Sequence, residues 1–273
     1  MKITQDIHIH THYSLCAKSD ATPQFYIDNA ATRGLNLIGF SDHMWDLGNG
    51  SALGIQPNLE YILQVKNDLA KCTIPDNLRV LVGCETDILS DSTLGISRDV
   101  AKQLDFVLVS QAHTHFFQVC PPQYQKDRRA CMRFCLDAFK RLMNHPDADL
   151  ITAVPHPLST HYANQNGGDS DLLEAVSDAE FKEAFLLAAE KNIGIEINAH
   201  TVKFACDSTN TDANDLNQLK NLQLYRMFSL AKEVGCKFTF GSDAHDQYAV
   251  SLFWLAQAMA DALDLTEDNL LLL

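Results

Sequence analysis

The chain has 273 residues, of which 46% are apolar and 21% charged, a composition typical of a globular protein with a sizeable core. Its 35 acidic and 21 basic residues give a net charge of −14, which argues against a broad basic surface for nucleic acid or an anionic membrane. The eight cysteines form no CxxC pair, and neither a secretory signal nor an apolar membrane span is evident, so we expect a cytoplasmic protein.

Seven short β-rich runs alternate with helical stretches along the chain. The runs cover 3–9, 36–41, 78–84, 105–110, 150–154, 193–198 and 237–241. Between them, residues 127–143 and 181–188 repeat apolar side chains at helical spacing. Strand-to-helix connections at 111–126, 157–178 and 199–214 are long and polar. This order predicts one α/β domain over residues 1–273, built as a parallel barrel or an open doubly wound sheet.

Each predicted strand ends in potential metal ligands or their polar neighbours. They are His8, His10, His12, Asp42, His43, Glu85, His113, His115, His156, Glu196, Asn198, Asp243 and His245. In a closed barrel the carboxyl ends of the strands converge, so these side chains would meet around one cavity. Strand alternation turns His8 and His10 to the same side, whereas His12 lies beyond the strand end. Imidazole with carboxylate suits zinc, manganese or iron, and this many ligands indicates more than one ion.

The motifs at the strand ends resemble those of the polymerase and histidinol phosphatase (PHP) family of metal-dependent phosphoesterases. The matching segments are DIHIHTHYS (6–14), GFSDH (39–43), GCE (83–85), VSQAH (109–113), PHP (155–157), EIN (196–198) and GSDAH (241–245). They extend over nearly the whole chain. The resemblance implies a distorted seven-stranded TIM-like β/α barrel, which agrees with the strand count.

The resemblance also implies the ligands of two or three divalent metal ions. The first ion would be bound by His8, His10, Glu85 and Asp243. The second ion would be bound by Glu85, His113 and His156. The third ion would be bound by His43, His245 and a residue eight positions after the first histidine.

That last position departs from the family pattern, which has a histidine or an aspartate there. Cys16 occupies it in this chain. A cysteine thiolate would favour zinc, and Asp20 is close enough in sequence to take its place. The third site therefore has two candidate ligands.

The resemblance extends to substrate binding and proton transfer. Histidinol-phosphatase-like members carry an arginine a few residues beyond EIN that binds the substrate phosphate, and Lys203 stands at the corresponding position. Lysine offers a point charge but lacks the two-pronged geometry of arginine. Glu85 would bridge two ions, and Asp243 or His245 would pass a proton to the leaving alkoxide.

Several other polar residues have a structural explanation beside a functional one. Asp42 is expected to orient a ligand rather than bind metal. Cys131 and Cys135 share the apolar face of their helix, so we expect them in the core. His161 and His200 lie in long loops where they could contact substrate.

These observations predict a phosphoesterase that hydrolyses a small-molecule phosphate monoester by means of a metal-bound hydroxide. Within the family the leading substrate is L-histidinol phosphate, which would make the protein an enzyme of histidine biosynthesis. The alternatives are a nucleotide phosphatase or nuclease of the same family, an amidohydrolase-type metal hydrolase, and a metal-binding scaffold without activity. The acidic charge disfavours a nuclease acting on long polymers. The sequence does not predict an oligomeric state.

Overall fold

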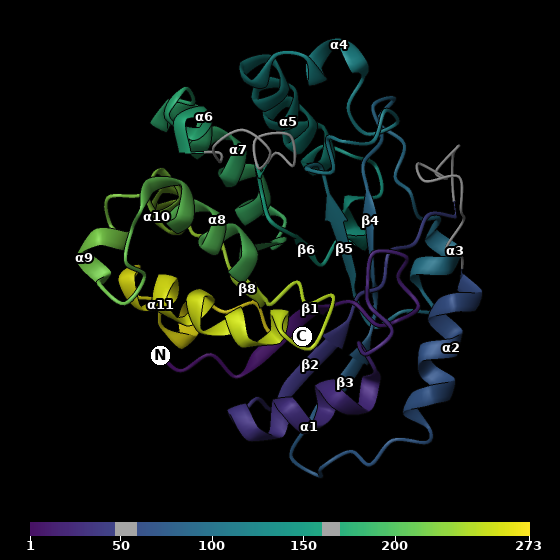
Figure 1. Ribbon diagram of the computed structural model, residues 1–273. Coiled ribbons are helices and arrows are strands. Elements are labelled where there is room, and N and C mark those ends of the chain that lie inside the picture. Colours follow the sequence, from purple (N-terminus) through teal and green to yellow (C-terminus); the bar gives the residue numbers. More distant parts are fainter. Residues whose placement is uncertain (47–58, 160–169) are drawn as a thin grey trace.

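All the strands in the described part of the chain, residues 1–46, 59–159 and 170–273 of a computed structural model, run parallel in two sheets (Figure 1). The first sheet contains β1 (Gln5–Ile9), β2 (Leu37–Phe40) and β3 (Arg79–Val82). The second contains β4 (Cys84–Asp87), β5 (Val107–Ser110), β6 (Ala153–Val154), β7 (Gly194–Asn198) and β8 (Phe238–Gly241). The parallel arrangement of strands predicted from the sequence is therefore confirmed.

Strands β3 and β4 are one extended run that changes sheets at Gly83. The first half pairs with β2 and the second half with β5. A side chain at position 83 would clash, because a Cβ there would lie 2.4 Å from the carbonyl oxygen of Phe106. The single strand predicted at 78–84 is thus wrong in detail, since the structure divides it and extends it to Asp87.

The two sheets meet again between β8 and β1. The amide of Asp243 donates to the carbonyl of His8 at 2.8 Å, and the amide of His10 donates to the carbonyl of Ala244 at 2.9 Å. With the Gly83 junction, this second seam closes the strands into the distorted TIM-like barrel predicted from the sequence. The organisation as one domain stays a prediction.

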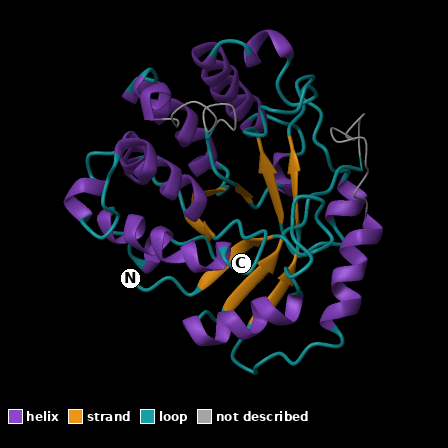
Figure 2. Cartoon of the chain, in the orientation of Figure 1, coloured by secondary structure: helices purple, strands orange, loops and turns teal. Residues whose placement is uncertain are grey.

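Helices surround the strands on the outside (Figure 2). They are α1 (Pro23–Arg33), α2 (Leu59–Leu69), α3 (Arg98–Ala101), α4 (Pro122–Gln125), α5 (Arg128–Met143), α6 (Ser170–Glu174), α7 (Asp178–Glu190), α8 (Ala199–Thr209), α9 (Leu216–Leu219), α10 (Gln223–Glu233) and α11 (Trp254–Ala262). Asp127 caps helix α5, since its side chain accepts a hydrogen bond from the amide of Arg129 at 2.9 Å. The helix buries Cys131 and Cys135 in the core, as predicted. None of the helices described is long and apolar enough to cross a membrane.

Helix α8 corrects the prediction of a loop over 199–214. The side chain of Asn198 accepts a hydrogen bond from the amide of Thr201 at 3.0 Å and so caps the helix. Val202 and Cys206 then bury one face at helical spacing. The many polar residues of this segment lie on the exposed face, which is why composition alone suggested a loop.

Candidate metal centre

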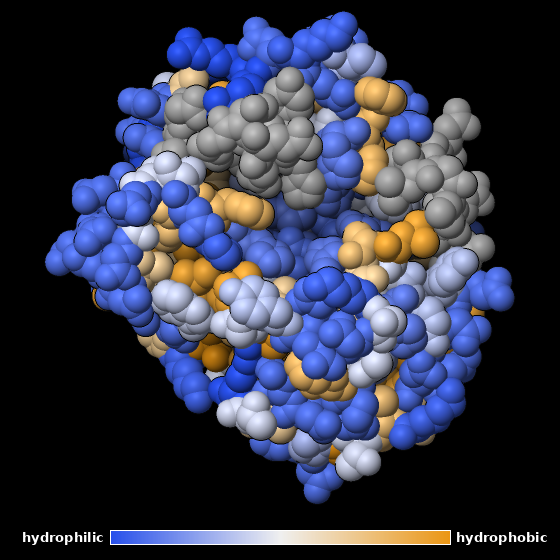
Figure 3. Space-filling view, in the orientation of Figure 1, coloured by the Kyte–Doolittle hydropathy of each residue, from blue (hydrophilic) through white to orange (hydrophobic). Residues whose placement is uncertain are grey.

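Side chains from the carboxyl ends of the strands gather into four overlapping groups of possible metal ligands. The groups are His8, His10 and Asp243; His8, Glu85 and His156; His43, Glu85 and His113; and His10, Cys16, His43 and His245. Within each group, one donor atom per residue lies within 4.8 Å of the others. The surface of the molecule is hollowed between α8 and strands β4 and β5, where hydrophilic residues line it (Figure 3).

Glu85 is the centre of these groups. Its Oε2 lies 3.3 Å from Nε2 of His8 and 3.4 Å from Nε2 of His10. Its Oε1 lies 2.9 Å from Nε2 of His156 and 3.5 Å from Nε2 of His113. Donor atoms of a tetrahedral zinc ion lie roughly 3.3 Å apart, as zinc–nitrogen bonds of about 2.0–2.1 Å require. These five buried side chains, together with Asp243, are called the inner cluster below.

Hydrogen bonds at the far sides of two histidines show why a cation fits the inner cluster. Nδ1 of His8 lies 2.8 Å from Oε1 of Glu196, an acceptor, so Nδ1 carries the proton. Nδ1 of His10 lies 3.1 Å from Oγ of Ser14, whose own hydroxyl donates to Asp42 at 2.7 Å. When Nε2 carries no proton, each ring points a lone pair inward, and the two Nε2 atoms are only 3.1 Å apart. A metal ion would accept both lone pairs and remove their repulsion.

Carboxylates stand behind the histidines in the arrangement that fixes metal-binding imidazoles. Glu196 holds His8, and Asp42 acts on His10 through Ser14. Asp87 holds Nδ1 of His113 at 2.9 Å. Sequence reasoning did not single out Asp87, although strand alternation places it on the same side as Glu85, two residues earlier.

The charges of the inner cluster oppose the effect of burial on its titrating groups. Burial alone would raise the pKa of Glu85, but His113, His8 and His43 outweigh it and hold that pKa well below its usual value. Burial alone would lower the pKa of His8, but nearby carboxylates, Glu196 foremost, raise it well above its usual value. The cluster therefore keeps Glu85 ionised, as a metal-binding carboxylate must be.

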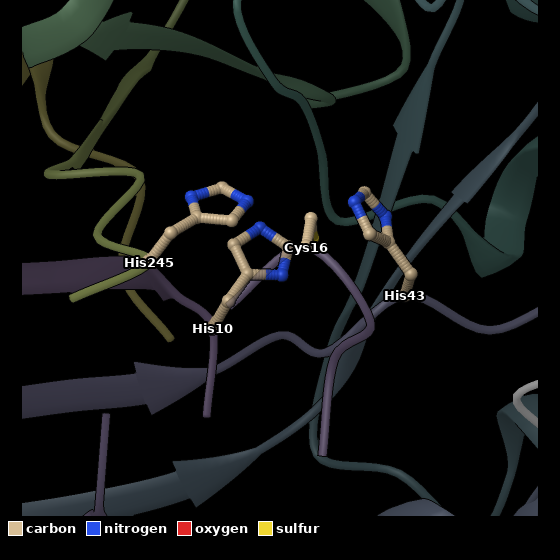
Figure 4. Close-up of side chains that lie close together, drawn as sticks. All are labelled: His10, Cys16, His43 and His245. Atoms are coloured by element: carbon tan, nitrogen blue, oxygen red, sulfur yellow. The ribbon is translucent and has the colours of Figure 1, made fainter. Parts of the chain in front are cut away.

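The fourth group, called the outer group below, consists of His10, Cys16, His43 and His245. Figure 4 shows the three imidazole rings around Cys16, from the loops after β1, β2 and β8. Burial lowers the pKa of His245 to about 4, so its ring is neutral near pH 7 and keeps a lone pair for a metal. Cys16 belongs to this group, whereas Asp20 belongs to none of the four groups found among the described residues.

Two of the possible ligands have strained backbone. His156 and Asp243 have φ values of 31° and 55°, in the left-handed region that residues other than glycine rarely adopt. Such strain persists where the surrounding structure imposes it, and it is concentrated at functional sites. Both residues therefore hold positions that the fold enforces at a conformational cost.

Other residues singled out in the sequence lie around or away from this centre. His12 belongs to none of the four groups, and its ring is tilted against that of Tyr13, with centroids 4.2 Å apart. His200 faces the centre, with Nδ1 3.9 Å from Oδ2 of Asp243. His161 lies outside the described residues.

Lys203 forms an ion pair with Asp207, one turn further along α8. Its side chain is about one-third exposed. Since His200 faces the metal centre one turn before Lys203, the amine lies on the same stretch of helix as a residue at the site.

Comparisons with known proteins find one matching family and several similar phosphatases. The family model described as PHP domain matches residues 6–200. A probable phosphatase of Clostridium acetobutylicum is 22% identical over 96% of this chain and 88% of its own length. A probable phosphatase of Shewanella halifaxensis is 27% identical over 99% of this chain and 89% of its own length.

Two solved structures share the fold. The histidinol phosphate phosphatase of Lactococcus lactis, complexed with zinc, L-histidinol and phosphate, has a TM-score of 0.61 and 16% identity over 95% of this chain and 93% of that one. A protein of Listeria monocytogenes named for histidinol phosphatase has a TM-score of 0.62 and 13% identity over 90% of this chain and 96% of that one. At these identities the likeness shows the fold alone.

Proposed function

We propose that this chain, which belongs to the PHP domain family, hydrolyses phosphate monoesters of small molecules with two or three divalent metal ions. The observation that carries the proposal is the position of Glu85. One of its oxygens faces His8 and His10, and the other faces His113 and His156. A carboxylate with both oxygens turned toward separate histidine pairs is suited to bridge two ions.

In this proposal the first two ions have the ligands that the family resemblance implied, and Cys16 takes the open position of the third. The first would be held by His8, His10, Glu85 and Asp243, the second by Glu85, His113 and His156, and the third by Cys16, His43 and His245. Bound zinc, manganese or iron would act as a Lewis acid on the phosphoryl oxygens and supply a nucleophile at neutral pH.

The chain's own groups would orient these ligands and move the proton. Asn198 donates to Oδ2 of Asp243 at 3.3 Å and to Oε2 of Glu196 at 3.1 Å, so one amide fixes two carboxylates. We assign the proton that reaches the leaving alkoxide to Asp243 or His245.

L-Histidinol phosphate is the leading candidate substrate. The fold similarity to an enzyme complexed with L-histidinol and phosphate supports it. Lys203 would contact the phosphate after exchanging its partner Asp207 for the substrate. The PHP match favours a phosphoesterase over an amidohydrolase-type enzyme, and the net charge of −14 disfavours long nucleic acids.

The test is release of inorganic phosphate from L-histidinol phosphate, a nucleoside monophosphate and an aryl phosphate, with zinc or manganese added. Activity on any of these that Glu85→Gln abolishes supports the proposal. Glu190→Gln, at an exposed position on α7, is the matched control and should leave activity unchanged. A preference for L-histidinol phosphate would assign the substrate. Absence of phosphate release from all three with metal bound would refute the phosphatase.

A further inference from the structure

A second pocket lies at the other end of the barrel from the metal centre, beside the amino ends of β1 and β2. Its volume is about 230 Å³. Lys2, Arg33 and Trp254 contribute to its wall. Figure 1 shows the N-terminus next to α11, whose first residue is Trp254. In β/α barrels catalytic groups lie at the carboxyl ends of the strands, so a charged pocket at this end needs another explanation.

Arg33 lacks the partners that a half-buried guanidinium normally has. Within the described residues it forms no hydrogen bond and no ion pair, and its Nη1 is shielded from solvent. The ring of Phe253, 5.9 Å from Cζ, provides a cation–π contact but accepts no hydrogen bond from Nη1. Asp6 is the acid that acts on Arg33 at longer range, and its carboxylate already accepts from the amides of His8 and Ser242. The guanidinium is thus a partly buried cation with no anion in contact among the residues described, and an anionic ligand in the pocket would pair with it.

The remaining walls are positive on one side and apolar on the other. Lys2 is exposed and, like Arg33, has no ion pair in the described part of the chain. Ile3, Leu35 and Phe253 are buried apolar side chains, and the indole of Trp254 is 46% exposed. Among the residues that the structure describes, no carboxylate lines this pocket, although the protein has 35 acidic residues against 21 basic ones. The pocket is therefore a local exception to the negative charge of the molecule.

We propose that this amino-end pocket binds a small organic anion in which a carboxylate or phosphate is attached to a flat apolar body. The anionic group accepts hydrogen bonds from Arg33 and Lys2. The flat body lies against Trp254 and Phe253. The volume is below the range of roughly 300–1,000 Å³ usual for drug-sized ligands, which limits the body to about one ring. This site is separate from the proposed phosphatase centre and does not depend on it.

Binding to the pocket can be measured through the fluorescence of Trp254. The chain has two tryptophans, and the other, Trp45, is 3% exposed. Titrating the metal-loaded protein with benzoate and with phenylphosphonate should change the tryptophan emission saturably, and Trp254→Phe should remove the change. The two probes separate the carboxylate from the phosphate form of the ligand. Benzyl alcohol, which has the ring but no charge, should bind at least about tenfold more weakly, since it leaves both cations unpaired.

Variants decide whether the two cations form the site. Arg33→Gln should weaken binding of the better probe at least about tenfold, and Lys2→Gln several-fold. Lys102→Gln removes a cation that is 65% exposed on another surface and should change nothing. Retained phosphate release and an unchanged circular dichroism spectrum would show that Arg33→Gln is folded. A response to neither probe, or equal affinities in Arg33→Gln and the unmodified chain, would overturn the proposal.

Discussion

The inner cluster and the outer group share His10 but differ in their surroundings. In the inner cluster the side chains of His8 and Glu85 are 0% and 1% exposed, and carboxylates fix the imidazoles from behind. In the outer group the side chains of His43 and His245 are 11% and 29% exposed, and a thiol stands where a histidine or an aspartate would be expected. Burial and fixed orientation favour tight metal binding, so the inner ions should be retained while the outer ion exchanges.

The largest effect is expected from Glu85→Gln, because it removes the negative charge and replaces one of the two oxygens that would hold the inner ions by an amide nitrogen. Phosphate release should fall by at least about a hundredfold, beyond the usual effect of changing an outer partner of a metal ligand. Metal analysis by mass spectrometry should show fewer bound ions per chain. Full metal content with full activity would contradict the bridging role.

The carboxylate behind His113 should have the next largest effect. Asp87→Asn keeps the shape of the side chain but removes the charge that orients the imidazole, so activity or metal affinity should fall about 10-fold to 100-fold. Asp91→Asn, at an exposed position after β4, is the control. If the two variants behave alike, Asp87 has no part in the site.

The outer group is tested by Cys16→Ser and Asp20→Asn, measured side by side. Cys16→Ser should remove one ion per chain, whereas Asp20→Asn should remove none, because Asp20 stands outside the groups of possible ligands. A chelator titration should release the Cys16-dependent ion first. Loss of an ion in Asp20→Asn would show that Asp20, rather than Cys16, is the ligand of the third ion.

The smallest effect is expected from Lys203→Gln. Lys203 is already paired with Asp207, so its contribution to phosphate binding is partly offset, and KM should rise only several-fold with kcat nearly unchanged. Lys203→Arg should restore or improve binding, because arginine contacts phosphate through two donors. A fall in kcat with constant KM would place Lys203 in the chemical step instead.

The sequence predicted the parallel barrel and the gathering of the inner cluster, because strand periodicity and barrel convergence are general properties of such chains. It did not predict Asp87, whose importance depends on the ring position of His113, a residue 26 positions away. Nor could it separate Cys16 from Asp20, because which of them lies near His43 and His245 depends on tertiary structure. The helix over 199–209 was not predicted because Asn198 was considered only as a polar residue of the site and not as the cap of a helix.

Some of the residues proposed to bind metal lie at each of the two junctions between the sheets. Glu85 follows the Gly83 junction, and His8, His10 and Asp243 lie where β8 meets β1. An ion bound by both Glu85 and His8 would thus connect the two sheets. Separation of the two sheets and release of the metal ion would then occur together. The concentration of free metal ion would in this way determine the stability of the folded barrel as well as the enzyme's activity.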